Sequence, residues 1–353
     1  MGARWRGLLE RARGRRVGVS RSSLAALRAA LLCALDHELD GAEAHLQVVA
    51  REDSSQVEVY LALARVYRLR GEVGRALRVH QNLLLRPDLG RAERCLALRG
   101  LAEDYRAGGF LGRATESYEE LLALLPRDRD VLRALVTLHR AARRPERALA
   151  LARRLRRSGG AGSPDEARRA EAALQLELAE QAHAEGRADE ARRALRRALR
   201  RDPSSAAAHV LRGELEVERG RSKRALVAWR RALELDRRRA PELLGKLRSA
   251  FAAVGRAGDF EPFLRERLRE RPDDGAVRLE LARVLEARGE SEPAAAELRA
   301  LLLAAPDHLE AQAELGRTLR AAGRCEEACD AYAAPGERLD RGGALRPEER
   351  GVE

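Results

Sequence analysis

Few residues in this sequence of 353 could bind a metal or act as a nucleophile. Asp36, His37 and Glu38 stand together, and His45 follows His37 by eight residues. Zinc sites on a helix place two ligands four residues apart on one face. A spacing of eight, with a predicted turn in between, does not fit that geometry. We therefore interpret both histidines as solvated or half-buried side chains.

The four cysteines are the next candidates, and none of them forms a CxxC pair. Cys325 and Cys329 would share one helix face, but a metal there would need two further ligands, and no Cys or His follows residue 334. We expect all four, Cys33, Cys95, Cys325 and Cys329, to be free and mostly buried thiols in a reducing compartment.

Motifs of the common enzyme classes are also missing. The sequence has no GxSxG, no dinucleotide-binding GxGxxG after a strand and no kinase motif set. The glycine-rich stretch SGGAGSPDE, residues 158–166, lacks the GK[ST] of a phosphate loop. The sequence therefore predicts a protein that is not an enzyme and has no cofactor and no metal.

Composition indicates an all-α fold. Aromatic residues make up only 3% of the chain, so the core must consist of Leu, Ala and Val. Leu, Ala, Arg and Glu all favour helices, and β-branched and aromatic residues are too few for a large sheet. The most apolar stretch, Leu24 to Leu35, contains Arg28 and is shorter than the ~20 residues that span a bilayer. We expect no membrane helix and no secretory signal.

One pattern recurs along the chain: an apolar helix, a glycine turn, and a second helix with Ala five residues after the glycine. Gly71 with Ala76 and Gly109 with Ala114 are clear examples. The later turns, at 186, 220, 255, 289 and 323, are 34 or 35 residues apart, which matches the tetratricopeptide period. The sequence predicts about nine helical hairpins, from near Ser22 to near Ala334, stacked in a right-handed superhelix.

Each position in this pattern has a physical role. Glycine tolerates the positive φ of a tight corner, and the small Ala lets the two helices cross closely. In weaker copies, Arg143 replaces the turn glycine before Ala148, Leu39 with Ala44 opens the array, and Phe260 stands where Ala is expected. Large residues before the turns should form the core, namely Tyr60, Leu63, Tyr67, Leu98, Leu101, Tyr105, Leu281 and Leu285.

The repeats and the composition divide the chain into five segments. We expect a basic N-terminal segment, an N-terminal sub-array, a linker or long loop, a C-terminal sub-array and a disordered tail, at residues 1–21, 22–157, 158–166, 167–334 and 335–353.

Two segments go beyond a generic repeat. Residues 70–81 read RGEVGRALRVHQ, and residues 101–114 read LAEDYRAGGFLGRA. With the stretch 91–98, they resemble the second and third repeats of the lipopolysaccharide assembly protein B family, including the unusual residues His80, Gln81 and Asp104. Weaker similarity extends from about Leu24 to about Ala305.

The resemblance implies an adaptor at the bacterial inner membrane. Members of that family have a membrane helix, a cytoplasmic repeat array and a rubredoxin-like metal ribbon. They couple a membrane protease to the deacetylase that commits carbon to lipid A. This sequence lacks the membrane helix and the paired CxxC motifs, so no metal ligand carries over. The resemblance therefore supports a cytoplasmic, partner-binding array.

Charge gives two further expectations. The formal net charge is +12, and Lys occurs only at Lys223 and Lys246. Residues 1–21 hold seven Arg with Trp5, Leu8 and Leu9, which favours weak contact with an anionic membrane, at about 1 kcal/mol per basic residue. A disordered cationic tail is the alternative.

The first helices of three successive hairpins carry arginines at similar heights. We expect these residues to line a groove that binds an acidic segment or a carboxylate of a protein partner; they are Arg65, Arg68, Arg99, Arg106, Arg133 and Arg140. The alternative is a basic helical-repeat protein that binds nucleic acid, which would need a basic stripe with exposed aromatic rings.

Overall fold

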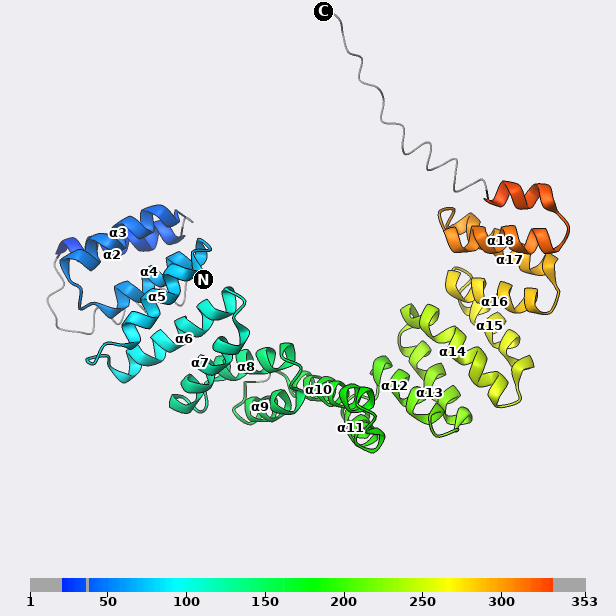
Figure 1. Ribbon diagram of the computed structural model, residues 1–353, viewed down its shortest axis with the longest axis horizontal. Helices are drawn as coiled ribbons and strands as arrows, with labels where there is room; N and C mark the ends of the chain where they lie inside the picture. Colours follow the sequence, from blue (N-terminus) through cyan, green and yellow to red (C-terminus); the bar gives the residue numbers. More distant parts are fainter. Residues whose placement is uncertain (1–20, 36–37, 161, 333–353) are drawn as a thin grey trace, which may run out of the picture. The chain divides into compact units, whose positions relative to one another are not determined.

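The computed structural model describes residues 21–35, 38–160 and 162–332, and these are helices joined by short turns (Figure 1). The described residues contain no strand. The predicted N-terminal segment, apart from Arg21, and the predicted tail lie outside them.

The chain divides into two compact units, residues 1–178 and 179–353, and the boundary between them in the sequence falls within helix α10. The first unit contains α2 (Arg21–Leu35), α3 (Leu39–Glu52), α4 (Val57–Leu69), α5 (Val73–Leu84), α6 (Arg91–Ala107), α7 (Leu111–Leu124), α8 (Arg129–Ala141), α9 (Pro145–Arg157) and most of α10 (Pro164–Ala184).

The second unit begins with the end of α10. Its other elements are α11 (Ala188–Arg201), α12 (Ala206–Val217), α13 (Ser222–Leu235), η1 (Arg237–Arg239), α14 (Ala240–Ala253), η2 (Ala257–Asp259), α15 (Phe260–Glu270), α16 (Gly275–Ala287), α17 (Ser291–Ala304), α18 (Leu309–Ala321) and a helix over residues 325–332. Within the described ranges, α2 to the last helix make nine consecutive pairs, which confirms the predicted number of hairpins.

The turn positions have the backbone conformation that their glycines predict. Positive φ values of 68° to 80° occur at Gly71, Gly109, Gly186, Gly220, Gly255, Gly289 and Gly323. Arg143 occupies the same corner with φ of 53°, the one positive φ of a non-glycine residue in the described part of the chain. The backbone of this corner is therefore kept even where the sequence supplies no glycine.

The crossing alanines are buried as expected. Ala76, Ala114 and Ala148 are fully buried, and Phe260 fills the same position in α15 at 2% exposure. The first pair departs from the prediction, because Ala44 is exposed and Ala42 is the fully buried residue. The glycine-to-alanine spacing could not be applied there, since α3 begins without a turn glycine.

Large residues before the turns form the core of each pair. Leu63, Tyr67, Leu98, Leu101, Tyr105, Leu281 and Leu285 are buried, and Tyr60 is partly buried. Prolines 87, 126, 203, 272 and 306 follow the ends of second helices, where proline cannot extend the helix. Capping side chains begin the next helices, with Asp128 on α8, Ser205 on α12 and Asp274 on α16.

The residues between α9 and α10 form a short connection. It runs from residue 158 to residue 163 and contains Gly159 and Gly162, both with positive φ. Helix α10 begins at Pro164, inside the stretch 158–166 that the sequence predicts as a linker. A boundary between sub-arrays at 158–166 remains a prediction.

Candidate partner-binding surfaces

Arg68 is the most constrained of the six predicted groove arginines. It lies at the end of α4 with its side chain 17% exposed, and it donates to the Asp104 carboxylate, to Glu103 at 2.8 Å and to the Gly100 carbonyl at 3.2 Å. All three acceptors belong to α6. Arg68 therefore links two successive helix pairs and is already occupied by carboxylates of its own chain.

Three further predicted arginines also have partners within the array. Arg99 pairs with Asp128, the residue that caps α8. Arg133 pairs with Asp130 at 2.9 Å and donates to the Gly160 carbonyl at 2.7 Å.

Arg140 of α8 reaches Glu177 of α10 at 2.5 Å. Arg133 and Arg140 are still about half exposed, so their pairs are open to water and to competing anions.

The remaining two predicted residues differ from each other. Arg65 is half-buried in α4, whereas Arg106 is exposed in the last turn of α6. The accessible cations of the predicted row are therefore Arg106, Arg133 and Arg140, and Arg68 belongs to the interior of the stack.

Ion pairs between the first helices of successive pairs recur in the second unit. Lys246 of α14 contacts Glu214 of α12 at 2.6 Å, and Arg248 contacts Glu280 of α16 at 3.4 Å. Arg283 of α16 contacts Glu314 of α18 at 3.1 Å. We call these contacts, with Arg68–Asp104 and Arg140–Glu177, the inter-pair ion pairs. Each of these cations is therefore already paired with a carboxylate of its own array.

Burial alters the pKa of several groups on these surfaces. Burial raises the pKa of the Glu280 carboxyl, and Arg248 and Arg283 only partly oppose it. Burial lowers the pKa of the His139 imidazole, and Glu119 at 3.5 Å only partly opposes that effect. For Asp128 burial acts in the raising direction, but hydrogen bonds from the Val131 N–H and from Arg99 outweigh it and lower the pKa. Each of these three groups lies within an ion pair or hydrogen bond of its own array.

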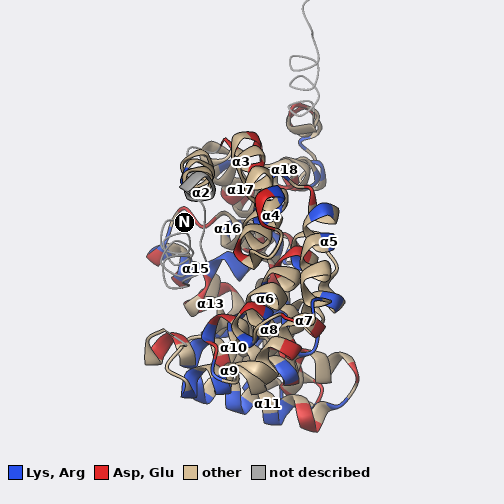
Figure 2. Ribbon diagram, turned by 90° about the vertical axis from the view of Figure 1, so that its left-hand side faces the viewer, with Lys and Arg blue, Asp and Glu red and all other residues tan. Residues whose placement is uncertain are grey.

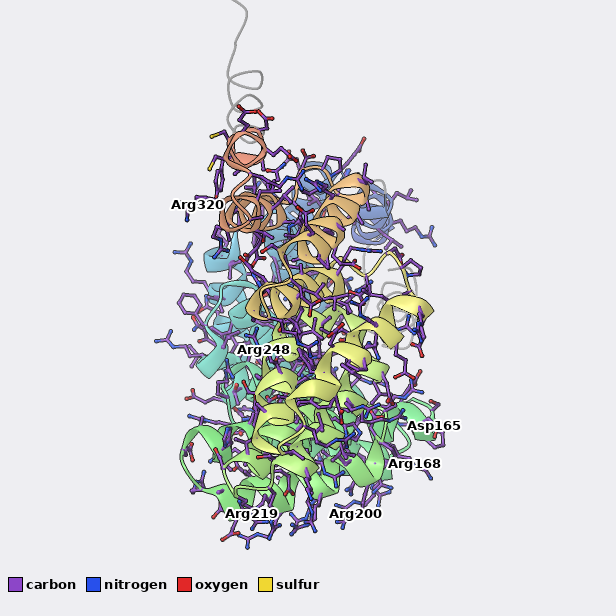
Figure 3. All side chains as sticks on the ribbon, turned by 90° about the vertical axis from the view of Figure 1, so that its right-hand side faces the viewer. Asp165, Arg168, Arg200, Arg219, Arg248 and Arg320 are labelled. Carbon is purple, nitrogen blue, oxygen red and sulfur yellow. The ribbon has the colours of Figure 1, made fainter. Side chains whose placement is uncertain are left out.

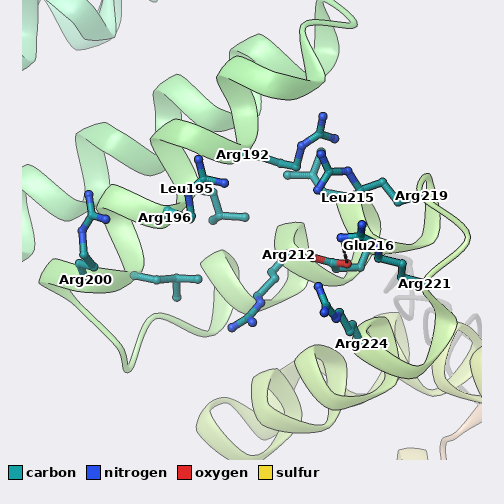
Figure 4. Close-up of a pocket in the computed structure, with 11 residues that line it drawn as sticks. Arg192, Leu195, Arg196, Arg200, Arg212, Leu215, Glu216, Arg219, Arg221 and Arg224 are labelled. Carbon is teal, nitrogen blue, oxygen red and sulfur yellow. Dashed lines mark ion pairs between the residues drawn. The ribbon is translucent and has the colours of Figure 1, made fainter.

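A pocket of about 430 Å³ lies in the second unit, between α11, α12 and the start of α13 (Figure 4). Seven arginines and one glutamate line it, above three leucines. Helix α11 supplies Arg192, Arg196 and Arg200, one on each turn. Arginines also follow this helix in Figure 2, and Arg200 and Arg219 project outward in Figure 3.

This pocket is not among the sites predicted from the sequence, although α11 carries a visible signal. Its sequence, ADEARRALRRALRR, repeats two arginines every four residues, so one of each pair falls on the same helix face. This stripe does not stand out in the sequence, because arginine is abundant in the whole chain. Only the packing of α12 and α13 beside α11 shows which of the two stripes borders a hollow.

The cysteines do not follow the expectation of mostly buried thiols. Cys95 is buried and Cys33 is half-buried, but Cys325 and Cys329 are exposed on the last described helix. That helix ends the described array, so no further pair covers its outer face. Among the described residues, no three His, Cys, Asp or Glu side chains gather in a way that could hold a metal ion.

None of the described helices combines the length and the apolarity that crossing a membrane requires.

Comparison with known proteins agrees with the helix pairs. Two tetratricopeptide repeat profiles match residues 140–307 and 279–337. The structure of Naa15/Naa10 bound to HypK-THB superposes on 91% of this chain and 47% of its own, with a TM-score of 0.51 and 16% identity, which shows a shared fold.

Two relatives carry the same name. Lipopolysaccharide assembly protein B of Escherichia coli (strain K12) is 30% identical over 244 residues, or 69% of this chain, and that of Haemophilus influenzae is 29% identical over 247 residues, or 70%. The chain spans 61% of the length of these relatives. It belongs to the tetratricopeptide repeat proteins and is related to lipopolysaccharide assembly protein B.

Proposed function

We propose that this chain is a non-catalytic adaptor that binds other proteins in the biogenesis of the bacterial envelope. The observation that carries the proposal is the relationship to lipopolysaccharide assembly protein B across an array of paired helices. Such arrays present extended surfaces on which a peptide or a folded partner can lie across several repeats. We further propose that it acts in the cytoplasm, at the inner membrane.

Of the six arginines predicted to line the groove in the first unit, we propose that only the accessible ones contact a partner. Arg106 is exposed, and Arg133 and Arg140 are about half exposed. A guanidinium in such a position can exchange a water-exposed carboxylate of its own chain for one of a partner at little cost. We therefore propose an acidic protein segment as the ligand of this surface.

Nucleic-acid binding has less support. Sequence-tolerant binding of single strands uses exposed aromatic rings on which bases stack. The exposed rings among the described residues are Phe110 and Tyr332, one in each unit. The described surface is therefore basic but has too few exposed aromatic rings for bases to stack on.

The test is affinity capture of proteins from a lysate of the native organism, with identification by mass spectrometry. One variant carries Arg106→Gln and Arg133→Gln. The matched control carries Arg78→Gln and Arg127→Gln, which remove the same charge from exposed positions elsewhere in the unit. Arg68 is left intact, because it contacts the buried Asp104.

We expect acidic proteins to be retained by the unaltered chain and by the control variant and lost from the first variant. Retention of the same proteins by both variants would move the partner surface away from this row. If the unaltered chain captures no protein beyond an empty matrix, the adaptor function itself is wrong.

A further inference from the structure

The arginine-lined pocket of the second unit has much more positive charge than its own carboxylates can balance. Arg192 and Arg219 share Asp189, at 2.5 and 3.7 Å, and Arg221 lies 3.9 Å from Glu216. No ion pair with another described residue is found for Arg196, Arg200, Arg212 or Arg224. Most of the guanidinium groups around this hollow therefore have no carboxylate partner among the described residues.

The pocket also has an apolar floor. Three leucines line it: Leu199 is half-buried and is the most accessible of them, and Leu195 and Leu215 are 4% and 2% exposed. A free phosphate or another small anion would use the guanidinium walls but not the leucines. A nucleic acid would gain little, because the lining contains no aromatic ring. A peptide with acidic residues beside a leucine-like side chain uses both.

The arrangement of the cations favours an extended or helical peptide over a single charged group. Arg192, Arg196 and Arg200 follow one another along α11, and Arg212 and Arg224 lie on the opposite side of the hollow (Figure 4). Successive carboxylates of a peptide lying along α11 would meet successive guanidinium groups, each as a charge-assisted and often bidentate hydrogen bond.

We infer that this pocket is a second binding site of the adaptor, and that its ligand is an acidic peptide segment with an apolar anchor residue. The inference rests on the proposed adaptor function and adds the class of ligand and the place where it binds. The site lies wholly within the second unit, so it is independent of the row of arginines in the first unit.

The test uses the full chain and a fluorescently labelled synthetic peptide, EELEELEEL, with binding followed by fluorescence anisotropy. One variant carries Arg196→Gln and Arg200→Gln, which line the pocket. The matched control carries Arg193→Gln and Arg197→Gln, which lie exposed on the same helix but outside the pocket. Both variants lose the same charge and keep a good helix former at each position.

We expect the unaltered chain to bind the peptide and the pocket variant to bind it about tenfold more weakly, as the loss of two exposed ion pairs implies. The control variant should bind like the unaltered chain. QQLQQLQQL, without charge, and EEGEEGEEG, without the anchor, should both bind more weakly. Added peptide should raise the melting temperature of the unaltered chain and of the control variant.

Equal losses in the two variants would overturn the inference, because attraction would then come from the charge of the whole unit. Equal binding of EEGEEGEEG and EELEELEEL would also overturn it, since the floor would play no part. Competition by inorganic phosphate as effective as by the peptide, or binding of anionic phospholipid vesicles in its place, would assign the pocket to another ligand. If the peptide fails to bind while protein capture persists, only the pocket assignment falls.

Discussion

The imidazole of His80 lies against the carboxylate of Asp104, with 2.6 Å between Nδ1 and Oδ2. His80 comes from α5 and is 2% exposed, Asp104 comes from α6 and is fully buried, and Arg68 of α4 closes the group from the other side. Three helices of two successive pairs thus share one buried polar cluster. Its members are hydrogen-bonded to one another, as buried polar groups must be.

Gly100 makes room for this cluster, and an alanine there should destabilise the first unit. A Cβ at residue 100 would lie 2.1 Å from Nε2 of His80. We expect Gly100→Ala to cost about 1–3 kcal/mol of unfolding free energy, as overpacking does, measured by guanidinium unfolding. In the His80→Ala background the same change should cost less, since the ring is gone. Additive costs in the double variant would show that the two residues do not interact.

Replacement of Arg143 by glycine should stabilise the folded protein. Its φ of 53° lies in the left-handed region. That conformation costs a residue with a Cβ atom roughly 1 kcal/mol or more, and glycine adopts it freely. We expect Arg143→Gly to raise the unfolding free energy by about 1 kcal/mol, measured by guanidinium unfolding. Gly220→Arg is the reverse exchange, at a glycine with φ of 68° and open space around it, and should lower it similarly. Two changes of the same sign would refute this account.

The crossing alanines should tolerate no large side chain. Ala76 is fully buried, so Ala76→Phe should cost roughly 1–3 kcal/mol, seen as a lower melting temperature. Ala44→Phe is the control, because Ala44 is exposed on α3 and the same side chain there meets solvent. A similar loss at both positions would mean that phenylalanine acts through helix propensity alone.

Mild acid should weaken the fold through His139. Burial holds the pKa of His139 in the folded chain below the value of 6.5 that applies when it is unfolded. Between these two values the unfolded chain binds more protons, so the unfolding free energy falls as pH decreases through that window. Replacing His139 by Gln should remove part of this slope when unfolding is measured at several pH values. An unchanged slope would assign the acid sensitivity to other groups.

The basic N-terminal segment should contribute to membrane contact. Seven arginines in residues 1–21 favour an anionic surface. We expect deletion of residues 1–21 to reduce cosedimentation with vesicles that contain anionic phospholipid, with neutral vesicles as the control. Unchanged cosedimentation would leave the segment without this role.

The fold could be predicted because its signals are local and repeated. The glycine turns and the buried Ala five residues later recur with one spacing, so even Arg143 could be recognised as a turn. Ala44 was misplaced because α3 has no turn glycine to fix the register. The candidate site was harder, since the sequence shows that Arg68 is a cation but not that Asp104 lies beside it. Side chains about a repeat apart meet only after the pairs stack.

The inter-pair ion pairs have a mechanical consequence within each unit. They join helices about one repeat apart in sequence, as Arg140 with Glu177 and Lys246 with Glu214 show. Contacts at such partly exposed positions weaken as salt screens them, whereas the leucine and alanine contacts beside them do not. The stiffness with which one repeat resists tilting against the next is therefore partly set by ionic strength. A partner rich in carboxylates would compete for the exposed cations among these pairs, such as Arg140. Its binding would therefore lower the stiffness of the repeats that it contacts.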